Sequence, residues 1–137
     1  MILAVCLDDN FGMSFLGRRQ SRDREVSSRM LSRLGNGRLW LEPRSAELFD
    51  KEDPRIKTVN MLPDGCADED VLFCEKLSLV ENLTRFSEFW IFRWNCVYPA
   101  DVYFPIDEVK ECFILSESMD FAGFSHERIT LEVYERA

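Results

Sequence analysis

Two uninterrupted apolar runs dominate the hydrophobic pattern of the chain, Ile2–Leu7 and Phe89–Phe92. Each run is too short for a solitary helix and is typical of a strand that is covered on both faces. Such a strand needs one layer above it and one below it, which predicts an α/β domain with both strands inside the sheet. Shorter apolar or alternating runs predict further strands at Leu39–Leu41, Ile56–Leu62, Val71–Cys74, Asp101–Phe104, Val109–Leu115 and Arg128–Tyr134.

Helical spacing of apolar residues occurs between these strands. Ser21 is placed to cap a helix, and the turn residues Gly35–Gly37 end it. Two more helices are expected, at Pro43–Phe49, where a proline opens the first turn, and at Ser78–Phe86. This alternation predicts a mostly parallel central sheet with helices on both faces, and the strand-rich C-terminal third adds antiparallel edge strands.

Length and composition fit a single domain over residues 1–137. Hydrophobic residues make up 46% of the 137 positions, enough for one core. No apolar run reaches the ~20 residues that cross a bilayer, and the start lacks the basic segment of a signal peptide. We therefore expect no membrane contact and a cytoplasmic location. Five scattered cysteines and one histidine, His126, argue against a metal site and favour reduced cysteines in the core.

Charge is distributed unevenly along the chain. The net charge of −8 argues against nucleic-acid binding, which requires a basic surface. Between Arg18 and Arg38, however, seven arginines stand against Asp23 and Glu25, and no lysine occurs. A solvated helix face is the simpler interpretation of this run. A bound anion is the alternative, because guanidinium groups bind phosphate and carboxylate in a bidentate manner.

Several local sequences, taken in order, resemble the dihydrofolate reductase family. Ile2–Met13 is similar to its first strand and the start of its mobile loop, with an inner alanine and then Asp, three residues and Gly-Met. Leu131–Arg136 resembles its closing strand, Phe-Glu-Val-Tyr/Leu-Glu-Arg or Lys. Three shorter matches lie between the ends, at Leu39–Glu47, Pro54-Arg55 and Phe104-Pro105. The resemblance spans most of the chain and implies the three-layer fold of that family.

The resemblance also implies roles for individual residues around a cleft that binds NADPH and a pterin. Ala4 and Phe11 would line the pterin and nicotinamide side of the cleft, and Ser45 would contact the dinucleotide at a helix N-terminus. Arg55 stands where an arginine of the family pairs with the substrate carboxylate. Each of these residues also has an ordinary structural explanation, as core packing, a helix cap or a surface arginine.

The sequence departs from the family where the chemistry is carried. Arg93-Trp94-Asn95 replaces the Gly-Gly pair that lets the backbone approach the pyrophosphate, and Glu42-Pro43 replaces another glycine. The acid that gives a proton to the pterin falls on Arg24; Asp23 or Glu25 could serve if the helix is shifted by one residue, a rotation of roughly 100°. A dinucleotide would also need other phosphate-binding residues, and the candidates are Arg18, Arg19, Arg44 and Arg93.

Two functions from different classes follow. The first is a weak or altered NADPH-dependent reductase of a pterin-like small molecule, with Asp23 or Glu25 as the acid. The second is a non-catalytic module that has kept the fold and binds a nucleotide, an anion or a protein, with a second copy of the chain among the candidate partners. Trp94 and Tyr98 suit either function, because they follow a strand at the end where open α/β sheets bind ligands.

Hydrolytic chemistry is the weakest hypothesis from the sequence. The chain offers no pairs of carboxylates with metal-ligand spacing, and a serine or cysteine nucleophile would depend on His126. That histidine lies in a polar Ser-His-Glu-Arg stretch, which predicts a surface residue.

Overall fold

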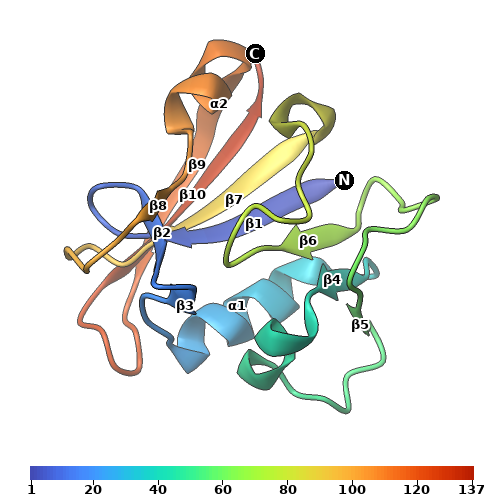
Figure 1. Ribbon diagram of the computed structural model, residues 1–137, viewed down its shortest axis with the longest axis horizontal. Helices are drawn as coiled ribbons and strands as arrows, with labels where there is room; N and C mark the ends of the chain where they lie inside the picture. Colours follow the sequence, from blue (N-terminus) through green and yellow to red (C-terminus); the bar gives the residue numbers. More distant parts are fainter.

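The computed structural model describes residues 1–137 and contains a twisted seven-stranded sheet (Figure 1). The strand order is β5-β4-β6-β1-β7-β10-β9; the first five strands are parallel, and β10 runs antiparallel to both of its neighbours. The two apolar runs lie side by side, with Ala4 opposite Trp90. The strands are β1 (Ile2–Leu7), β4 (Leu39–Leu41), β5 (Ile56–Thr58), β6 (Val71–Phe73), β7 (Glu88–Arg93), β9 (Phe113–Phe121) and β10 (Ile129–Arg136).

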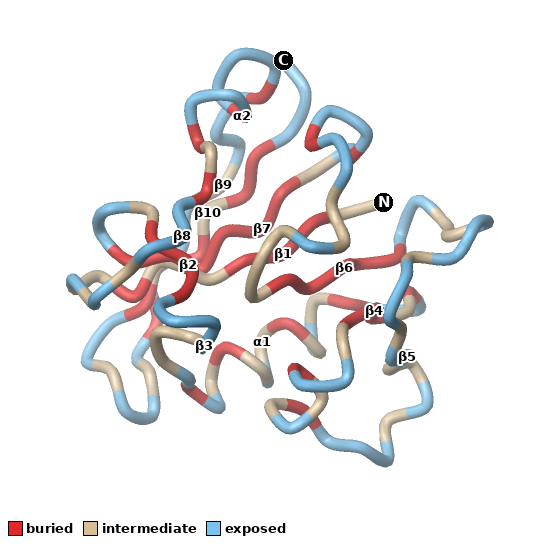
Figure 2. Tube along the Cα trace, in the orientation of Figure 1, coloured by how far each residue is buried: buried red, intermediate tan, exposed pale blue.

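Alternate residues of the central strands feed two separate cores, one on each face of the sheet. Leu3 and Phe89 face a core that is covered by the short 3₁₀ helix η2 (Leu83–Arg85; η marks 3₁₀ helices) and by the α-helix α2 (Ile106–Cys112). Ala4 and Trp90 face the other core, covered by α1 (Arg24–Leu34) and η1 (Pro43–Leu48). Figure 2 shows the buried trace concentrated in the central strands. The expected α/β fold with helices on both faces is confirmed, and each fully buried Leu or Phe contributes about 1.5–3 kcal/mol of hydrophobic free energy.

A second, three-stranded sheet lies beside the C-terminal end of β1. It consists of β2 (Gly12–Phe15), β3 (Arg18–Arg19) and β8 (Val102–Tyr103), in the order β3-β2-β8. The β2–β3 turn has positive φ angles at Leu16 (52°) and Gly17 (73°), which match the twist of a tight hairpin. This hairpin carries Arg18 and Arg19 to the end of the main sheet.

The segment before β9 is a helix where we predicted a strand. The alternating pattern of Val109–Leu115 predicted β structure, but Ile106–Cys112 forms α2 and the strand begins only at Phe113. Val109 and Phe113 are both buried, and their four-residue spacing also fits one face of a helix. Asp107 and Glu108 in the first turn stabilise the helix dipole, so the helical period prevails.

Other predicted boundaries also change. Ser78–Phe86 was expected to be a helix, but only the single turn η2 forms there, because Asn82 caps that turn and binds the backbone N–H of Thr84. Asp23, and not Ser21, caps α1. The strand predicted at Ile56–Leu62 ends at Thr58.

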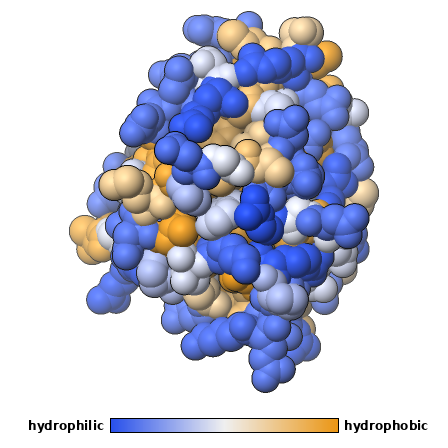
Figure 3. Space-filling view, turned by 90° about the vertical axis from the view of Figure 1, so that its right-hand side faces the viewer, coloured by the Kyte–Doolittle hydropathy of each residue, from blue (hydrophilic) through white to orange (hydrophobic).

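The surface is predominantly polar. Figure 3, which looks onto the side that lies at the right in Figure 1, shows hydrophilic side chains with small, separate apolar patches. The edge strand β5 has only three residues and exposes Lys57, which discourages pairing with another sheet. None of the helices combines the length and apolar character needed to cross a bilayer. All five cysteines are free thiols; Cys74 is buried, and Cys112 is exposed at the end of α2.

Candidate functional site

Polar side chains gather where the parallel strands end. The C-terminal ends of β1, β4, β6 and β7 share one edge of the sheet, where open α/β sheets commonly bind ligands. Three features occur there: a small cavity beside α1, a cationic depression beneath the β2–β3 hairpin, and a histidine cluster at the start of α1.

The cavity beside α1 is narrow. It holds about 30 Å³, room for one or two water molecules, whereas small-molecule pockets span about 300–1,000 Å³. Its apolar wall includes Met13, Phe73 and Trp94, and its polar wall includes Ser21 and Asp23. A bicyclic ring therefore does not fit this cavity unless its walls move.

Arg19 closes one side of this cavity. Its guanidinium forms ion pairs with Glu75 and Glu47 and donates a hydrogen bond to the Arg44 carbonyl at 3.0 Å. Ser45 Oγ donates to Glu75 Oε1 at 2.7 Å. The hydroxyl that we expected to contact a dinucleotide is thus engaged by Glu75. These contacts tie β3 and η1 to the loop after β6, and the Arg19–Glu75 pair lines both the cavity and the depression beside it.

The cationic depression beneath the hairpin is lined entirely by glycine and polar residues. Four of them are cations and two are carboxylates. Arg19 is neutralised by Glu75 and Glu47, but Arg18, Arg44 and Lys76 make no ion pair. The lining residues are Ser14, Gly17, Arg18, Arg19, Glu42, Arg44, Ser45, Glu75 and Lys76.

Asp23 accepts hydrogen bonds with both carboxylate oxygens. The backbone N–H groups of Glu25, Phe124 and Ser125 each donate to it at 2.9 Å. The ring Nδ1 of His126 lies 2.9 Å from Asp23 Oδ2. Burial alone raises the pKa of Asp23, but these donors outweigh burial and hold the pKa well below its ordinary value. The geometry thus favours an ionised, accepting carboxylate over a proton donor.

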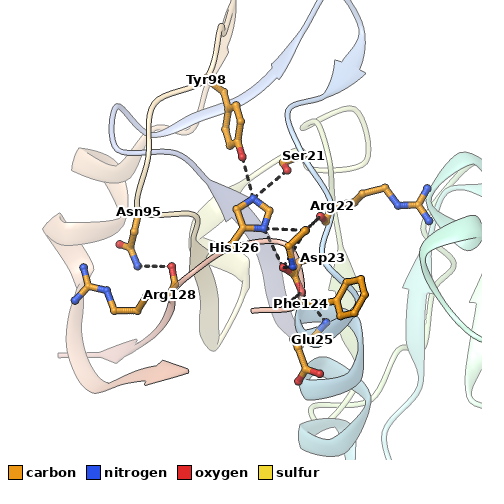
Figure 4. Close-up of polar contacts among 10 residues, drawn as sticks. Ser21, Arg22, Asp23, Glu25, Asn95, Tyr98, Phe124, His126 and Arg128 are labelled. Atoms are coloured by element: carbon orange, nitrogen blue, oxygen red, sulfur yellow. Dashed lines mark hydrogen bonds and ion pairs between the residues drawn. The ribbon is translucent and has the colours of Figure 1, made fainter. Parts of the chain in front are cut away.

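His126 is the centre of the third feature, although its polar sequence context predicted a surface residue. The side chain is only 9% exposed. Its Nε2 lies 2.9 Å from Tyr98 Oη and 3.1 Å from Ser21 Oγ, as Figure 4 shows. The ring of Trp94 stacks on the imidazole with centroids 4.6 Å apart. The prediction of a surface histidine is wrong, because the β9–β10 loop folds back onto the start of α1.

Asp8 joins the loops around this site. It is fully buried and accepts hydrogen bonds from the backbone N–H groups of Gly12 (2.8 Å) and Tyr98 (3.1 Å) and from Gln20 Nε2 (3.1 Å). Gly12 has no room for a side chain, since a Cβ there would lie 2.6 Å from Ala100 Cβ. The loop after β7 is therefore packed against the loop after β1, which fixes Tyr98 beside His126.

The remaining residues predicted from the resemblance lie apart from these features. Ala4 is fully buried in the middle of β1. The Arg93 guanidinium carbon lies over the Phe11 ring, 4.4 Å from the ring centroid. Arg93 also forms an ion pair with Glu132. Arg55 pairs with Asp53 at 2.7 Å and donates to the carbonyl oxygens at the end of α1.

Glu25 also lies away from the cavity. It lines a different surface depression together with Ser28 and Arg29, and its side chain points away from the histidine cluster (Figure 4). Of the predicted site residues, Asp23, Trp94 and Tyr98 meet at His126, and Arg44 and Ser45 meet at the cationic depression.

Sequence reasoning missed Ser21, Glu75 and the role of His126. Ser21 was interpreted as a helix cap, and Glu75 carried no signal because its partners Arg19 and Ser45 are distant in sequence. The one available signal was that His126 is the only histidine. Nothing in the sequence places it near Asp23, which lies 103 residues earlier.

Comparison with solved structures identifies the architecture. The chain is similar to a dihydrofolate reductase from Enterococcus faecalis complexed with NADP(H) and RAB-propyl, with a TM-score of 0.70 and 13% sequence identity, over 99% of this chain and 96% of that one. No protein-family model and no curated protein matches the sequence. The chain therefore has a dihydrofolate reductase-like fold, as the motifs at its two ends predicted.

Proposed function

We propose that this dihydrofolate reductase-like chain is a binding module for a phosphate-bearing ligand, such as a nucleotide, and not a reductase. The observation that carries the proposal is the cationic depression. Arg18, Arg44 and Lys76 line it without ion-pair partners, together with Glu42 and the Arg19–Glu75 ion pair, in a chain of net charge −8. Unpaired cations that lie close together repel one another, and a bound phosphate relieves that repulsion.

The position of the depression supports the same proposal. It lies past the C-terminal ends of β4 and β6, where parallel sheets bind nucleotides. A wider open depression of about 500 Å³ adjoins it across the hairpin and contains Arg18, Phe15 and Tyr98. A ligand with phosphate groups and a ring can place the phosphates on the arginines and the ring against these aromatic side chains. The similar enzyme was complexed with NADP(H), so NADP⁺ is the first ligand to test.

Titration calorimetry of the whole chain with NADP⁺, ADP and inorganic pyrophosphate tests the proposal. We expect saturable binding of at least one of them that weakens as salt is raised from about 50 to 200 mM. The double variant Arg44→Gln/Lys76→Gln should weaken it at least about 10-fold, since each lost charged hydrogen bond costs about 1.5–3 kcal/mol. Lys110→Gln on α2 is the matched control and should bind as the wild type does. No saturation at millimolar ligand, or equal affinity in the double variant, contradicts the proposal.

A weak NADPH-dependent reductase of a pterin-like molecule is the second candidate. It is favoured by the apolar wall of the cavity next to Asp23 and by the likeness in fold. The ionised carboxylate weighs against it, because Asp23 accepts hydrogen bonds with both oxygens and has no proton to give. We expect no oxidation of NADPH above background with dihydrofolate or dihydropterin. Turnover that is lost in Asp23→Asn would establish the reductase instead. We also propose a cytoplasmic location and self-association of the chain as a homodimer.

A further inference from the structure

Ser21, His126 and Asp23 form a linear chain of hydrogen bonds. Ser21 Oγ lies 3.1 Å from His126 Nε2, and His126 Nδ1 lies 2.9 Å from Asp23 Oδ2. The carboxylate side chain has no exposed surface and the imidazole is 9% exposed, whereas Ser21 is only partly buried. Figure 4 shows the imidazole between the carboxylate and the two hydroxyl groups of Ser21 and Tyr98. A hydroxyl, an imidazole and a buried carboxylate in this order are the parts of a nucleophilic triad.

The carboxylate determines which imidazole nitrogen carries the proton. Because Asp23 is ionised, it accepts from Nδ1–H, which leaves Nε2 as the basic nitrogen that faces the hydroxyls. Trp94 stacked on the ring prevents it from rotating away. Capping of α1 requires only the contact between Asp23 and the Glu25 N–H, so the ordered histidine is not explained by the helix cap.

Tyr98 supplies a second function at Nε2. Its hydroxyl lies 2.9 Å from that nitrogen, close to Ser21. A neutral imidazole nitrogen accepts one strong hydrogen bond, so the two hydroxyls compete for it. Once the Ser21 proton occupies Nε2, the tyrosine proton is free to point at an oxyanion that develops beside Ser21.

We propose that Ser21 is the nucleophile of an esterase site, with His126 as general base and Asp23 as the residue that orients it, for carboxylic esters that carry an anionic group. The open depression of about 500 Å³ is lined by Tyr98 and by Gln20, the residue before Ser21, whereas Ser21 itself lines the narrow cavity beside α1. The ester would therefore approach the Ser21 hydroxyl from the Tyr98 side. The walls of the depression combine Arg18 and Arg19 with the exposed apolar side chains Phe15 and Leu16. This lining suits a substrate with one negative charge and an apolar part.

The reaction balances without a cofactor. Ser21 Oγ bonds to the acyl carbon, its proton moves to His126 Nε2, and the carbonyl electron pair moves to oxygen. Collapse of this intermediate breaks the bond to the leaving alcohol, which takes the proton from Nε2. Water then attacks the acyl-serine and gives its proton to Nε2; collapse releases the carboxylic acid and returns the proton to Ser21 Oγ.

This inference goes beyond the proposed phosphate ligand and does not depend on Arg44 or Lys76. A fluorophosphonate probe on the whole chain tests it, because an activated hydroxyl displaces fluoride to form a covalent adduct and an ordinary surface serine does not. We expect labelling at Ser21, located by peptide mass spectrometry, with loss of the label in Ser21→Ala. His126→Gln and Asp23→Asn should slow labelling by about 100-fold or more. Ser28→Ala, an exposed serine of α1, should label as the wild type does.

Substrate class is tested with p-nitrophenyl esters. We expect the wild type to hydrolyse the anionic p-nitrophenyl hemisuccinate with kcat/KM at least about 10-fold above that for p-nitrophenyl acetate, and Ser21→Ala to lose both activities. Ser21→Ala should keep the melting temperature of the wild type, so its loss of activity is not a loss of folding. Absence of labelling at Ser21, labelling of Tyr98 in its place, or equal rates in Ser21→Ala would overturn the proposal.

Discussion

Asp23 and Asp70 are two buried carboxylates with opposite surroundings. Asp70 lies at the start of β6, where it accepts hydrogen bonds from the Arg38 N–H (2.9 Å), the Arg38 guanidinium (2.9 Å) and Trp40 Nε1 (3.0 Å). Asp23 accepts an equally full set of bonds, but one of its partners is the imidazole of His126. Both carboxyls are held ionised, and in both cases hydrogen-bond donors outweigh burial and lower the pKa.

The two carboxylates differ in whether their hydrogen-bond partners can take up and release a proton. The partners of Asp70 are a guanidinium, an indole and backbone amides, none of which changes its protonation state near neutral pH. The Asp23 network continues through His126 to two hydroxyls beside a cavity. Asp70 therefore fixes the N-terminal edge of the parallel strands, whereas Asp23 fixes a group able to do chemistry at the opposite edge. Two sites with similar burial and the same direction of pKa shift are thus distinguished by their partners.

The largest effect on stability is expected from Asp70→Asn. The amide group of asparagine brings donors to face Arg38, Trp40 and the Ala67 N–H, and it removes the ion pair. We expect the free energy of unfolding to fall by about 3 kcal/mol in urea titrations, with labelling of Ser21 unchanged. A loss of labelling in a folded Asp70→Asn chain would show that the two sites are coupled.

Asp23→Asn is the matched substitution at the other edge. When the amide oxygen takes the place of Oδ1 it still caps α1, but the amide N–H₂ in the place of Oδ2 then faces the Ser125 N–H and His126. We expect the free energy of unfolding to fall by about 2 kcal/mol, less than in Asp70→Asn. Unlike Asp70→Asn, this change should also disorder the imidazole, which the proton spectrum of the single histidine would report. An unaltered histidine signal contradicts the orienting role of Asp23.

Acid should destabilise the wild type through both carboxylates. Their folded-state pKa values lie below the ordinary value of about 3.9, so the unfolded chain binds more protons as the pH falls toward that value. Their contribution is complete above about pH 5 and is lost as the pH drops through the unfolded and then the folded pKa. Urea titrations at pH 7, 5, 4 and 3 should show a shallower decline in Asp70→Asn and Asp23→Asn than in the wild type. Parallel curves for all three proteins would contradict these pKa assignments.

The smallest effect is expected from Tyr98→Phe. It removes one of two hydroxyls that compete for His126 Nε2, so Ser21 can keep the ring nitrogen satisfied. We expect a loss of about 1 kcal/mol or less in the free energy of unfolding. Fluorophosphonate labelling should continue, while ester turnover falls about 10-fold because the oxyanion loses a donor. A loss of stability as large as that of Asp23→Asn would make Tyr98 a structural anchor instead.

Much of the fold could be predicted because local patterns determine it. The apolar runs Ile2–Leu7 and Phe89–Phe92 have no polar interruption, so their strand character and their place inside the sheet were predicted; the structure pairs them side by side. Helix α2 was not predicted correctly, because the spacing of Val109 and Phe113 fits both a strand period and a helix period. The residues Leu77–Phe86 mimic helical spacing because they touch the core at separate points of an irregular path.

The candidate site was less predictable because loops assemble it. Asp23 and Tyr98 drew attention through their sequence neighbourhoods, but the contact that joins them is His126, in the β9–β10 loop. Asp23 and Tyr98 lie 103 and 28 positions before His126, and contacts over such separations leave no periodic signal. The ionisation of Asp23 likewise depends on the N–H groups of Phe124 and Ser125, whose positions only the folded chain fixes.

The presence of one histidine in the whole chain has a practical consequence. Its ring protons give a pair of resonances that need neither isotope labelling nor assignment, and they arise from the middle of the Ser21–His126–Asp23 network. Stacking on Trp94 shifts those resonances through the ring current of the indole. The molecule thus carries its own spectroscopic reporter, and ligands, acid or substitutions that disturb the network can be followed in unmodified protein.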